Sequence, residues 1–464
     1  MATLRIGSAL IYQNILTHHI RLRRPHRFVC KSMTKTTPDA TSADLRRRSG
    51  NYQPSPWDHC YLLSIENKYA SEKEVINRDV LKEKVKMMFD VEKKSRLEQL
   101  ELIDDLQKLG VSYHFELDIN DTLTDFHLKN ERNVWKCDKE EDLHAISLEF
   151  RLLRQHGFDV SENIFDVIID KIESNTFKSN GIKGIIYLYE ASFLSKKSDT
   201  KLHKVIRPFA TEQIRKFVED ETNNIEEREK AIHALEMPYH WRMRRLETRW
   251  YIDAYKKTQD MNLVLVEFAK IDFNIVQAAH QEDLKYVSSW DVNRLGELPE
   301  YMRLCFLILY NETNGIGCDI LKYKKIDVIP LLKKSTLCQH PQHIVRCSAT
   351  VLRLANDLGT SSSELARGDV LKSVQCYMHE TGASEKTARD HVQQMISDTW
   401  DDMNYETKTA RSSSLLSRGF VEAAMNLARM SQCMYQYGDG HGCPDKAKTV
   451  DRVQSLLVDP IPLN

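Results

Sequence analysis

Helical periodicity before a glycine constrains the fold of this 464-residue chain more than any other feature. Apolar side chains recur at the spacing of one helix face: Leu97, Leu100, Ile103, Leu106 and Leu109. Gly110 follows them as a plausible stop. Similar segments continue along the chain, and no credible run alternates apolar and polar residues as a half-buried strand would. Because glycine (16) and proline (12) are also scarce, the sequence predicts an all-α protein.

The overall charge excludes some classes of function. The formal net charge is −1, so bulk charge supports neither nucleic-acid binding nor attachment to a membrane surface. No apolar run reaches the ~18 residues that a membrane span needs. The 10 cysteines include no CxxC pair, which argues against a zinc ribbon or a disulfide framework and favours a reducing compartment.

The N-terminus differs in composition from the rest of the chain. Residues 1–38 contain no Asp or Glu, but they carry several arginines and many Ser and Thr residues. This profile is typical of a mitochondrial or plastid transit peptide, with a disordered basic tail as the alternative. We therefore exclude residues 1–44 from the predicted fold.

A polar helix face lies within the segment RLANDLGTSSSE, residues 353–364. Asn356, Thr360 and Glu364 are spaced one helical turn apart, so they lie along one face. Amide, hydroxyl and carboxylate oxygens are hard ligands that Mg²⁺ accepts. Arg353 lies one turn earlier and could contact an anion that shares the metal. The segment therefore predicts a site for a metal and a diphosphate, with a plain polar helix face as the alternative.

This segment resembles the second metal-binding motif of class I terpene synthases, Asn/Asp-Asp-x-x-Ser/Thr-x-x-x-Glu. Arg47, Arg48 and Trp57 resemble the paired-arginine-x8-Trp motif of plant monoterpene synthases, although the two arginines could also be the tail of the basic leader. The segments HWRMRRLETRW, LPEYMRLCFLILYN and MNLARMSQCMYQYGDGHG are similar to that family as well. The resemblance covers nearly all of residues 45–464 and is strongest to limonene-, pinene- or terpinene-type synthases.

The resemblance implies a fold of two helical domains. Residues 45–236 would form an α-barrel-like N-terminal domain, and residues 237–464 would form the C-terminal class I terpenoid synthase bundle. The charged stretch Glu219–Glu236 and Pro238 agree with a boundary at this point. The family resemblance further implies a plastid protein, which we expect to be a monomer.

The implied reaction is the ionisation and cyclisation of geranyl diphosphate to a monoterpene, with Mg²⁺ as cofactor and Mn²⁺ as an alternative. Asn356, Thr360 and Glu364 would bind the metal. Arg353 would bind the diphosphate, with Lys372 as a weaker candidate. Arg47, Arg48 and Trp57 would cap the site. In the family, Tyr435 and Asp439 lie near the pocket in or beside a mobile loop, although a plain surface turn is an equal alternative for that loop.

The chain departs from the family in one respect that concerns catalysis. The first metal motif, Asp-Asp-x-x-Asp, is absent: Asp104-Asp105 is followed by Leu-Gln-Lys, and Asp401-Asp402 by Met-Asn-Tyr. The family segments that normally flank this motif are fused at Trp290, and a second junction follows Leu331–Ser335. These apparent deletions near 290 and 335 support a second hypothesis, a catalytically impaired or silent isoform.

Other motifs carry less weight. His379-Glu380 resembles the start of a zinc protease motif, but the second histidine is absent because position 383 is Ala. Gly438 and Gly440 do not follow a strand, which argues against a dinucleotide site. Trp241 and Trp250 lie among arginines, where helix packing is favoured over a nucleic-acid surface.

Overall fold

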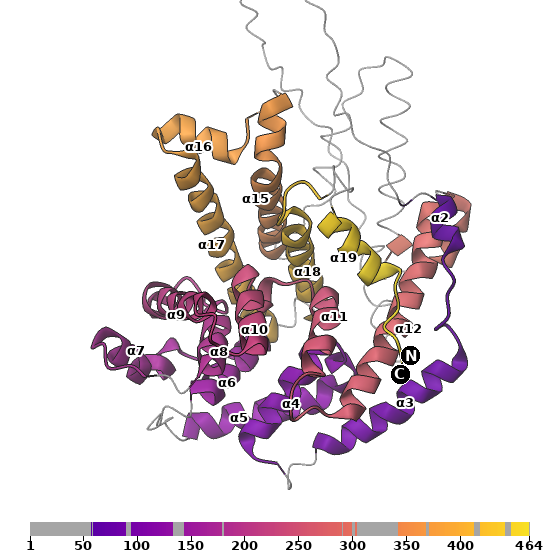
Figure 1. Ribbon diagram of the computed structural model, residues 1–464, viewed down its shortest axis with the longest axis horizontal. Coiled ribbons are helices and arrows are strands. Elements are labelled where there is room, and N and C mark those ends of the chain that lie inside the picture. Colours follow the sequence, from indigo (N-terminus) through magenta and orange to yellow (C-terminus); the bar gives the residue numbers. More distant parts are fainter. Residues whose placement is uncertain are drawn as a thin grey trace, which may run out of the picture. The chain divides into compact units, whose positions relative to one another are not determined.

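The computed structural model contains helices and no strand among the residues that it describes (Figure 1). These residues are 57, 59–89, 94–132, 143–178, 181–289, 291–298, 302–303, 342–367, 371–412, 418–440 and 447–463. The predicted all-α class is confirmed. Among the described residues, no helix combines the length and the apolar character that crossing a lipid bilayer requires.

The helices follow one another along the chain. The α-helices are α2 (His59–Ser64), α3 (Glu72–Lys86), α4 (Arg96–Lys108), α5 (Glu116–Arg132), α6 (Leu143–Gln155), α7 (Asp166–Glu173), α8 (Ile182–Ser192), α9 (Arg207–Glu219), α10 (Ile225–Glu236), α11 (Arg244–Tyr255), α12 (Leu263–Ser288), α15 (Gln342–Arg367), α16 (Ser373–Thr381), α17 (Glu385–Ser412), α18 (Arg418–Tyr435) and α19 (Ala447–Leu457). Short stretches of other helix types lie between them: η1 (Met87–Phe89), η3 (Ser112–Phe115), η5 (Glu162–Phe165), η6 (Leu202–Ile206), η7 (Tyr239–Trp241) and η8 (Val292–Glu297).

Helix α4 ends where the sequence predicts, just before Gly110, and its start is fixed by a capping box. The Ser95 hydroxyl accepts a hydrogen bond from the Glu98 backbone N–H (3.3 Å), and the Glu98 carboxylate accepts one from the Ser95 N–H (2.6 Å). Gly110 follows the helix with φ +75°, a conformation that favours glycine. A Cβ at Gly110 would lie 2.4 Å from Thr248 Oγ1, so the glycine also lets α4 end close against α11.

Among the described residues, two hydrophobic cores hold the helices together. The first joins buried side chains of α6 to α10 with those of α15 to α18. The second joins buried side chains of α3, α4, α5 and α6 with those of α11, α12 and Ile461. Each core takes side chains from both sides of the predicted boundary at residues 236 and 237. The two cores are therefore not divided at this boundary, and the division of the chain into two domains at this point stays a prediction.

The last described residues are bound to the middle of α12 by side-chain amides. Asn274 Nδ2 donates to the Ile461 carbonyl (2.8 Å), and the Ile461 N–H donates to Asn274 Oδ1 (2.7 Å). Further along α12, Gln277 and Gln281 donate to the carbonyls of Leu456 (3.1 Å) and Leu457 (3.0 Å). These amides satisfy carbonyls that the end of α19 would otherwise leave without a helical partner.

Candidate active site

The polar face of α15 brings two of the three predicted metal residues into contact. Thr360 Oγ1 lies 2.9 Å from Glu364 Oε2 and 2.9 Å from the Asn356 carbonyl oxygen. Thr360 is buried, whereas Asn356 and Glu364 are half-buried. The structure thus brings the Thr360 hydroxyl and the Glu364 carboxylate together on one side of the helix.

Lys372 reaches the same carboxylate from a different element. It is the N-cap residue of α16, and its Nζ lies 3.2 Å from Glu364 Oε2. The two side chains are 15% and 17% exposed, so solvent reaches both groups. Lys372, which the sequence offered only as a weaker candidate, therefore lies beside the metal residues.

Asp357 is a residue of this site to which the sequence analysis assigned no role. Its carboxylate is buried, and Oδ2 accepts hydrogen bonds from the Ser373 backbone N–H (3.1 Å) and from the Ser373 hydroxyl. Ser373 is the first residue of α16, where a helix attracts negative charge. Asp357 thereby holds the start of α16, and with it Lys372, against α15. The sequence contained a signal for this residue, because the family motif has an aspartate at the position of Asp357.

Arg353 lies one turn before Asn356 and pairs with Asp357. Its Nε is 3.1 Å from Asp357 Oδ1, but its side chain is 63% exposed. A guanidinium has five N–H donors, so this contact leaves it able to bind an anion. Arg353 is therefore accessible to a diphosphate, as the sequence predicts, although its role stays a prediction.

The end of α18 lies against the turn of α15 that carries the metal residues. A Cβ at Gly359 would lie 2.9 Å from the Tyr435 carbonyl oxygen and 3.0 Å from the Gly438 carbonyl oxygen. Only a glycine permits this approach without a shift of the backbone. The backbone of Tyr435 is thus close to Thr360, and Asp439 in the following loop is buried. The function of the Tyr435 side chain stays a prediction.

The predicted cap over the site is described only in part. Arg47 and Arg48 lie outside the described residues. Trp57 is half-buried, and its ring lies edge-on to Tyr61 with 5.5 Å between the ring centroids. The segment after α2 is tied to α12, because Asn67 Nδ2 donates to the Ala278 carbonyl (3.0 Å). The capping role of the three residues stays a prediction.

The donor set on α15 fits a magnesium ion that arrives with a diphosphate. Asn356, Thr360 and Glu364 offer an amide, a hydroxyl and a carboxylate oxygen, all of them hard ligands. The single carboxylate is paired with Lys372, so these side chains alone bring little net negative charge. Mg²⁺ commonly binds through one or two carboxylates together with substrate phosphates, and such a site needs no further acidic residue.

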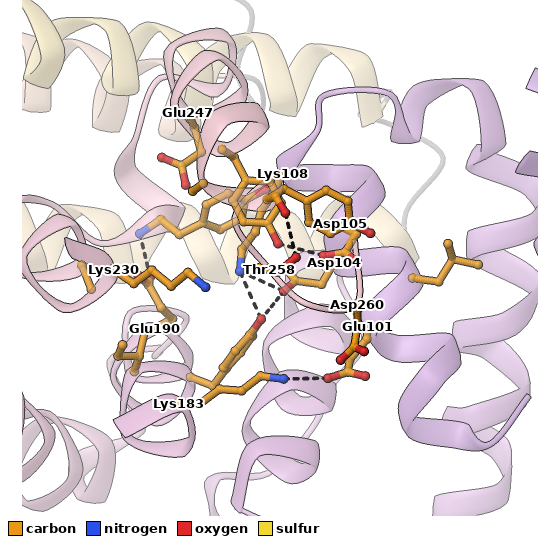
Figure 2. A pocket seen from close by; sticks show the side chains of 18 of the residues that line it. Glu101, Asp104, Asp105, Lys108, Lys183, Glu190, Lys230, Glu247, Thr258 and Asp260 are labelled. Atoms are coloured by element: carbon orange, nitrogen blue, oxygen red, sulfur yellow. Dashed lines mark hydrogen bonds and ion pairs between the residues drawn. The ribbon is translucent and has the colours of Figure 1, made fainter. Parts of the chain in front are cut away.

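A second polar region surrounds a cavity of about 470 Å³ lined by residues of α4, α8, α10 and α11 (Figure 2). None of the predicted site residues that the structure describes lines it. Figure 2 shows Lys183 reaching Glu101 across it, with 2.8 Å between Nζ and Oε1. Beside them, Asp104 Oδ2 accepts from Lys108 Nζ (2.9 Å) and the Tyr187 hydroxyl (2.6 Å).

The carboxyl groups of Asp104 and Asp105 have pKa values that are shifted in opposite directions. Burial opposes the ionisation of Asp104, but Lys108 and Arg151 outweigh it and hold the pKa of that carboxyl well below its usual range. For the neighbouring Asp105, burial and then the charge of Asp104 raise the pKa to about 7, although the Tyr251 hydroxyl donates to it (2.8 Å). Asp104 is thus surrounded by partners that balance its charge, which indicates a structural role.

Three family models match the chain. The terpene synthase N-terminal domain matches residues 56–235, the terpene synthase metal binding domain matches residues 282–340, and the C-terminal metal binding region of terpene synthase family 2 matches residues 337–402. The last match contains all of the predicted metal residues. These models establish a divalent metal cofactor for the family.

Similar curated proteins extend over the whole chain. 1,8-cineole synthase 1 of Arabidopsis thaliana is 68% identical, with 100% of this chain and 99% of that protein covered. Beta-myrcene/(E)-beta-ocimene synthase 2 of the same plant is 61% identical, with 100% of each chain covered. The alignment with the cineole synthase is 595 positions long, whereas this chain has 464 residues. That relative therefore has internal sequence without a counterpart here. The predicted deletions near 290 and 335 stay a prediction, and these junctions lie at or beside residues outside the described ones.

Solved structures show the same fold. A limonene synthase with 2-fluorolinalyl diphosphate has a TM-score of 0.73 and 30% identity, covering 90% of this chain and 100% of its own. Isoprene synthase from grey poplar has a TM-score of 0.66 and 31% identity, with the same coverage. The predicted two-domain terpene synthase fold is thus confirmed at the level of fold class.

The names of the curated relatives also bear on localisation. The two proteins described above and two further Arabidopsis relatives are all named chloroplastic. The predicted plastid localisation is therefore confirmed. Taken together, the matched models, the identity over the whole length and the shared fold show that this chain belongs to the terpene synthase family, as a plant monoterpene synthase of class I, a lyase that acts on prenyl diphosphates.

Proposed function

We propose that this chain ionises geranyl diphosphate at the C-terminal end of α15, with Mg²⁺ as the metal, and that the resulting cation cyclises to a monoterpene. The observation that carries the proposal is the pair of side chains beside the Glu364 carboxylate, with the Thr360 hydroxyl at 2.9 Å and the Lys372 ammonium at 3.2 Å. The relatives that support a monoterpene product are named cineole and myrcene/ocimene synthases.

The side chains at this site have separate roles in the proposed reaction. When bound, the metal would supply positive charge that weakens the allylic C–O bond. Asn356, Thr360 and Glu364 would hold it on one face of α15. Lys372, which lies beside Glu364, would contact a diphosphate oxygen. Arg353 would bind the diphosphate through N–H groups that Asp357 does not occupy.

Asp357 acts as a positioning residue in this scheme. Its hydrogen bonds to Ser373 hold the first turn of α16 against α15. Lys372 is the adjacent N-cap residue, so the distance between its ammonium and Glu364 depends on this contact. Asp357 therefore acts through Lys372 and need not touch the substrate.

The absent aspartate-rich motif lowers the turnover that we expect. Loss of one electrostatic group from an active site commonly raises the barrier by about 3 kcal/mol, roughly a hundredfold in rate. The loss of a whole carboxylate cluster is more severe. Our second candidate is accordingly a catalytically silent isoform, which the absence of Asp-Asp-x-x-Asp from the 464 residues favours.

The test is incubation of the full chain with geranyl diphosphate and Mg²⁺, followed by gas chromatography–mass spectrometry of the volatiles. We expect a small Mg²⁺-dependent terpene signal that EDTA abolishes and that Glu364→Gln removes. The matched control is Glu385→Gln, which changes an exposed glutamate paired with Arg389 on α17 and should leave the signal unchanged.

A binding measurement separates the two candidates. Calorimetric titration of the chain with pyrophosphate in the presence of Mg²⁺ measures ligand binding at the site and requires no turnover. Binding that Glu364→Gln removes, without any volatile product, would support the silent isoform. Absence of both binding and product from a helical, soluble sample would contradict the proposed site. We further propose a monomer, which light scattering during size-exclusion chromatography tests.

A further inference from the structure

A second group of metal-ligating side chains lies where the start of α15 packs on α17. His343 and Cys347 are one turn apart on α15, and Asp402 lies on α17. One ligand atom of each lies within 4.8 Å of the others. The Cys347 sulfur is 3.9 Å from His343 Nδ1. Among the described residues, no other group of three such side chains meets this condition.

A fourth side chain lies beside this group, in contact with His343. Glu406 lies one turn after Asp402 on α17, and its Oε1 is 3.1 Å from His343 Nδ1. Each helix therefore presents two ligands at the i, i+4 spacing that places side chains on one face. Two such pairs on packed helices can surround a single ion, as metal sites in helix bundles do.

We propose that His343, Cys347, Asp402 and Glu406 bind a Zn²⁺-class metal ion at a site separate from that of the reaction. A thiolate, an imidazole and carboxylates suit zinc, whereas the all-oxygen set of Asn356, Thr360 and Glu364 suits magnesium. Bond lengths of about 2.3 Å to sulfur and 2.0 Å to nitrogen place the two atoms about 3.5 Å apart in a tetrahedral site. The 3.9 Å separation of Cys347 and His343 is thus close to what zinc requires.

The charges around the thiol are consistent with a bound cation. Cys347 is buried, and burial together with the carboxylates of Asp402 and Glu406 raises the pKa of its thiol to about 11. A metal ion would neutralise these carboxylates and stabilise the thiolate. Lys197 now pairs with Asp402 (2.8 Å), but its side chain is 66% exposed and free to turn into solvent. Arg346 is the other cation close enough to affect the thiol.

The ion would fasten the beginning of α15 to α17. From Cys347 to Thr360 the helix rises by about 20 Å, at about 1.5 Å per residue, so the two sites do not share ligands. The ion would act on the reaction only through the position of α15. Its presence is independent of whether the chain turns over geranyl diphosphate.

The test is titration of Co²⁺, which takes the place of zinc and is coloured, into the full chain after treatment with EDTA and a thiol reductant. We expect one equivalent to bind, with the absorption of tetrahedral Co²⁺ and a thiolate-to-cobalt charge-transfer band, and Zn²⁺ should displace it. Cys347→Ser should remove the charge-transfer band. The matched control Cys376→Ser changes an exposed cysteine on α16 and should retain it.

Two further variants keep the test decisive if Cys347→Ser does not fold. His343→Gln changes a half-exposed side chain, and Asp402→Asn a partly exposed one, so both should fold, and each should weaken Co²⁺ binding at least tenfold. No charge-transfer band in the folded wild-type chain, or unchanged affinity in both variants, would overturn the proposal.

Discussion

The carboxylates of Asp104 and Glu364 both lie between helices and both pair with a lysine, but their surroundings differ. The Asp104 side chain is 1% exposed and is paired with Lys108 and Arg151. The Glu364 side chain is 17% exposed and has one cation, Lys372, beside it. The first carboxylate is enclosed by protein partners, whereas the second is accessible to a ligand.

This difference in exposure predicts which carboxylate contributes to stability and which to ligand binding. A buried ion pair whose partners are complete is strongly destabilised when one member is removed, because a charge is then left unpaired in the interior. An accessible pair contributes little to stability, because water can replace either partner. We therefore expect substitutions around Asp104 to affect folding and substitutions around Glu364 to affect ligand binding.

Asp104→Asn should have the largest effect on stability. The substitution leaves the buried Arg151 charge and the half-buried Lys108 charge without their carboxylate, and we expect a loss of about 3–5 kcal/mol in the free energy of unfolding. Urea denaturation followed by circular dichroism measures it. The control is Asp125→Asn, which changes an exposed ion pair with Lys129 on α5 and should cost less than about 1 kcal/mol. Equal losses in both variants would contradict the contrast between enclosed and accessible carboxylates.

Asp105→Asn should change the dependence of stability on pH. The pKa of Asp105 is raised from 3.8 to about 7 in the folded state, so the folded chain keeps a proton that the unfolded chain has lost. Its contribution to stability therefore falls as pH rises from about 4 to about 7, and then stays constant. Asparagine cannot ionise, and the stability of the variant relative to wild type should rise over this window.

The free energy of unfolding of Asp105→Asn, relative to that of wild type, should rise by about 1–2 kcal/mol over this pH range. The rise is no larger because part of the Asp105 surface is exposed to solvent. Histidines whose pKa values are lowered by burial, such as His144, produce the opposite slope, but they are present in both proteins and cancel in the difference. Urea denaturation of both proteins at pH 4.5, 6 and 8 measures it. A constant difference across the three values would mean that Asp105 does not hold the proton.

Asp357→Asn should have a smaller and local effect. The amide oxygen can still accept from Ser373, but the negative charge at the start of α16 is lost, which costs about 1 kcal/mol. Hydrogen exchange should therefore increase in the first turn of α16 and much less elsewhere. Asp390→Asn, at an exposed position on α17, is the control and should leave the exchange of α16 unchanged.

Glu364→Gln should have the smallest effect on stability and a large effect on binding. We expect less than about 1 kcal/mol of destabilisation, because its pair with Lys372 is accessible to solvent. Mg²⁺-dependent pyrophosphate binding should nevertheless fall at least tenfold. If Glu364→Gln were strongly destabilised but still bound pyrophosphate, the proposed contrast between Glu364 and Asp104 would be wrong.

The sequence predicted the helices and one part of the site well. Periodicity and a glycine were enough for α4, because the local pattern and the final packing agree there. The spacing of Asn356, Thr360 and Glu364 sufficed for one face of α15 for the same reason. Lys372 could be suggested but not placed, because its position depends on the contact between Asp357 and Ser373. The group of His343, Cys347, Asp402 and Glu406 could not be predicted at all, since its two halves lie on different helices.

The hydrogen bonds between Asn274 and Ile461 have a consequence for how the chain is made. The two residues are 187 positions apart, so at synthesis rates of about 5–20 residues per second the second appears about 10–40 s after the first. Until then, α12 lacks a partner that completes its core. The nascent chain therefore cannot complete this core until Ile461 has been synthesised. During that interval, we expect the apolar face of α12 that Ile461 later covers to be a surface that a chaperone could recognise.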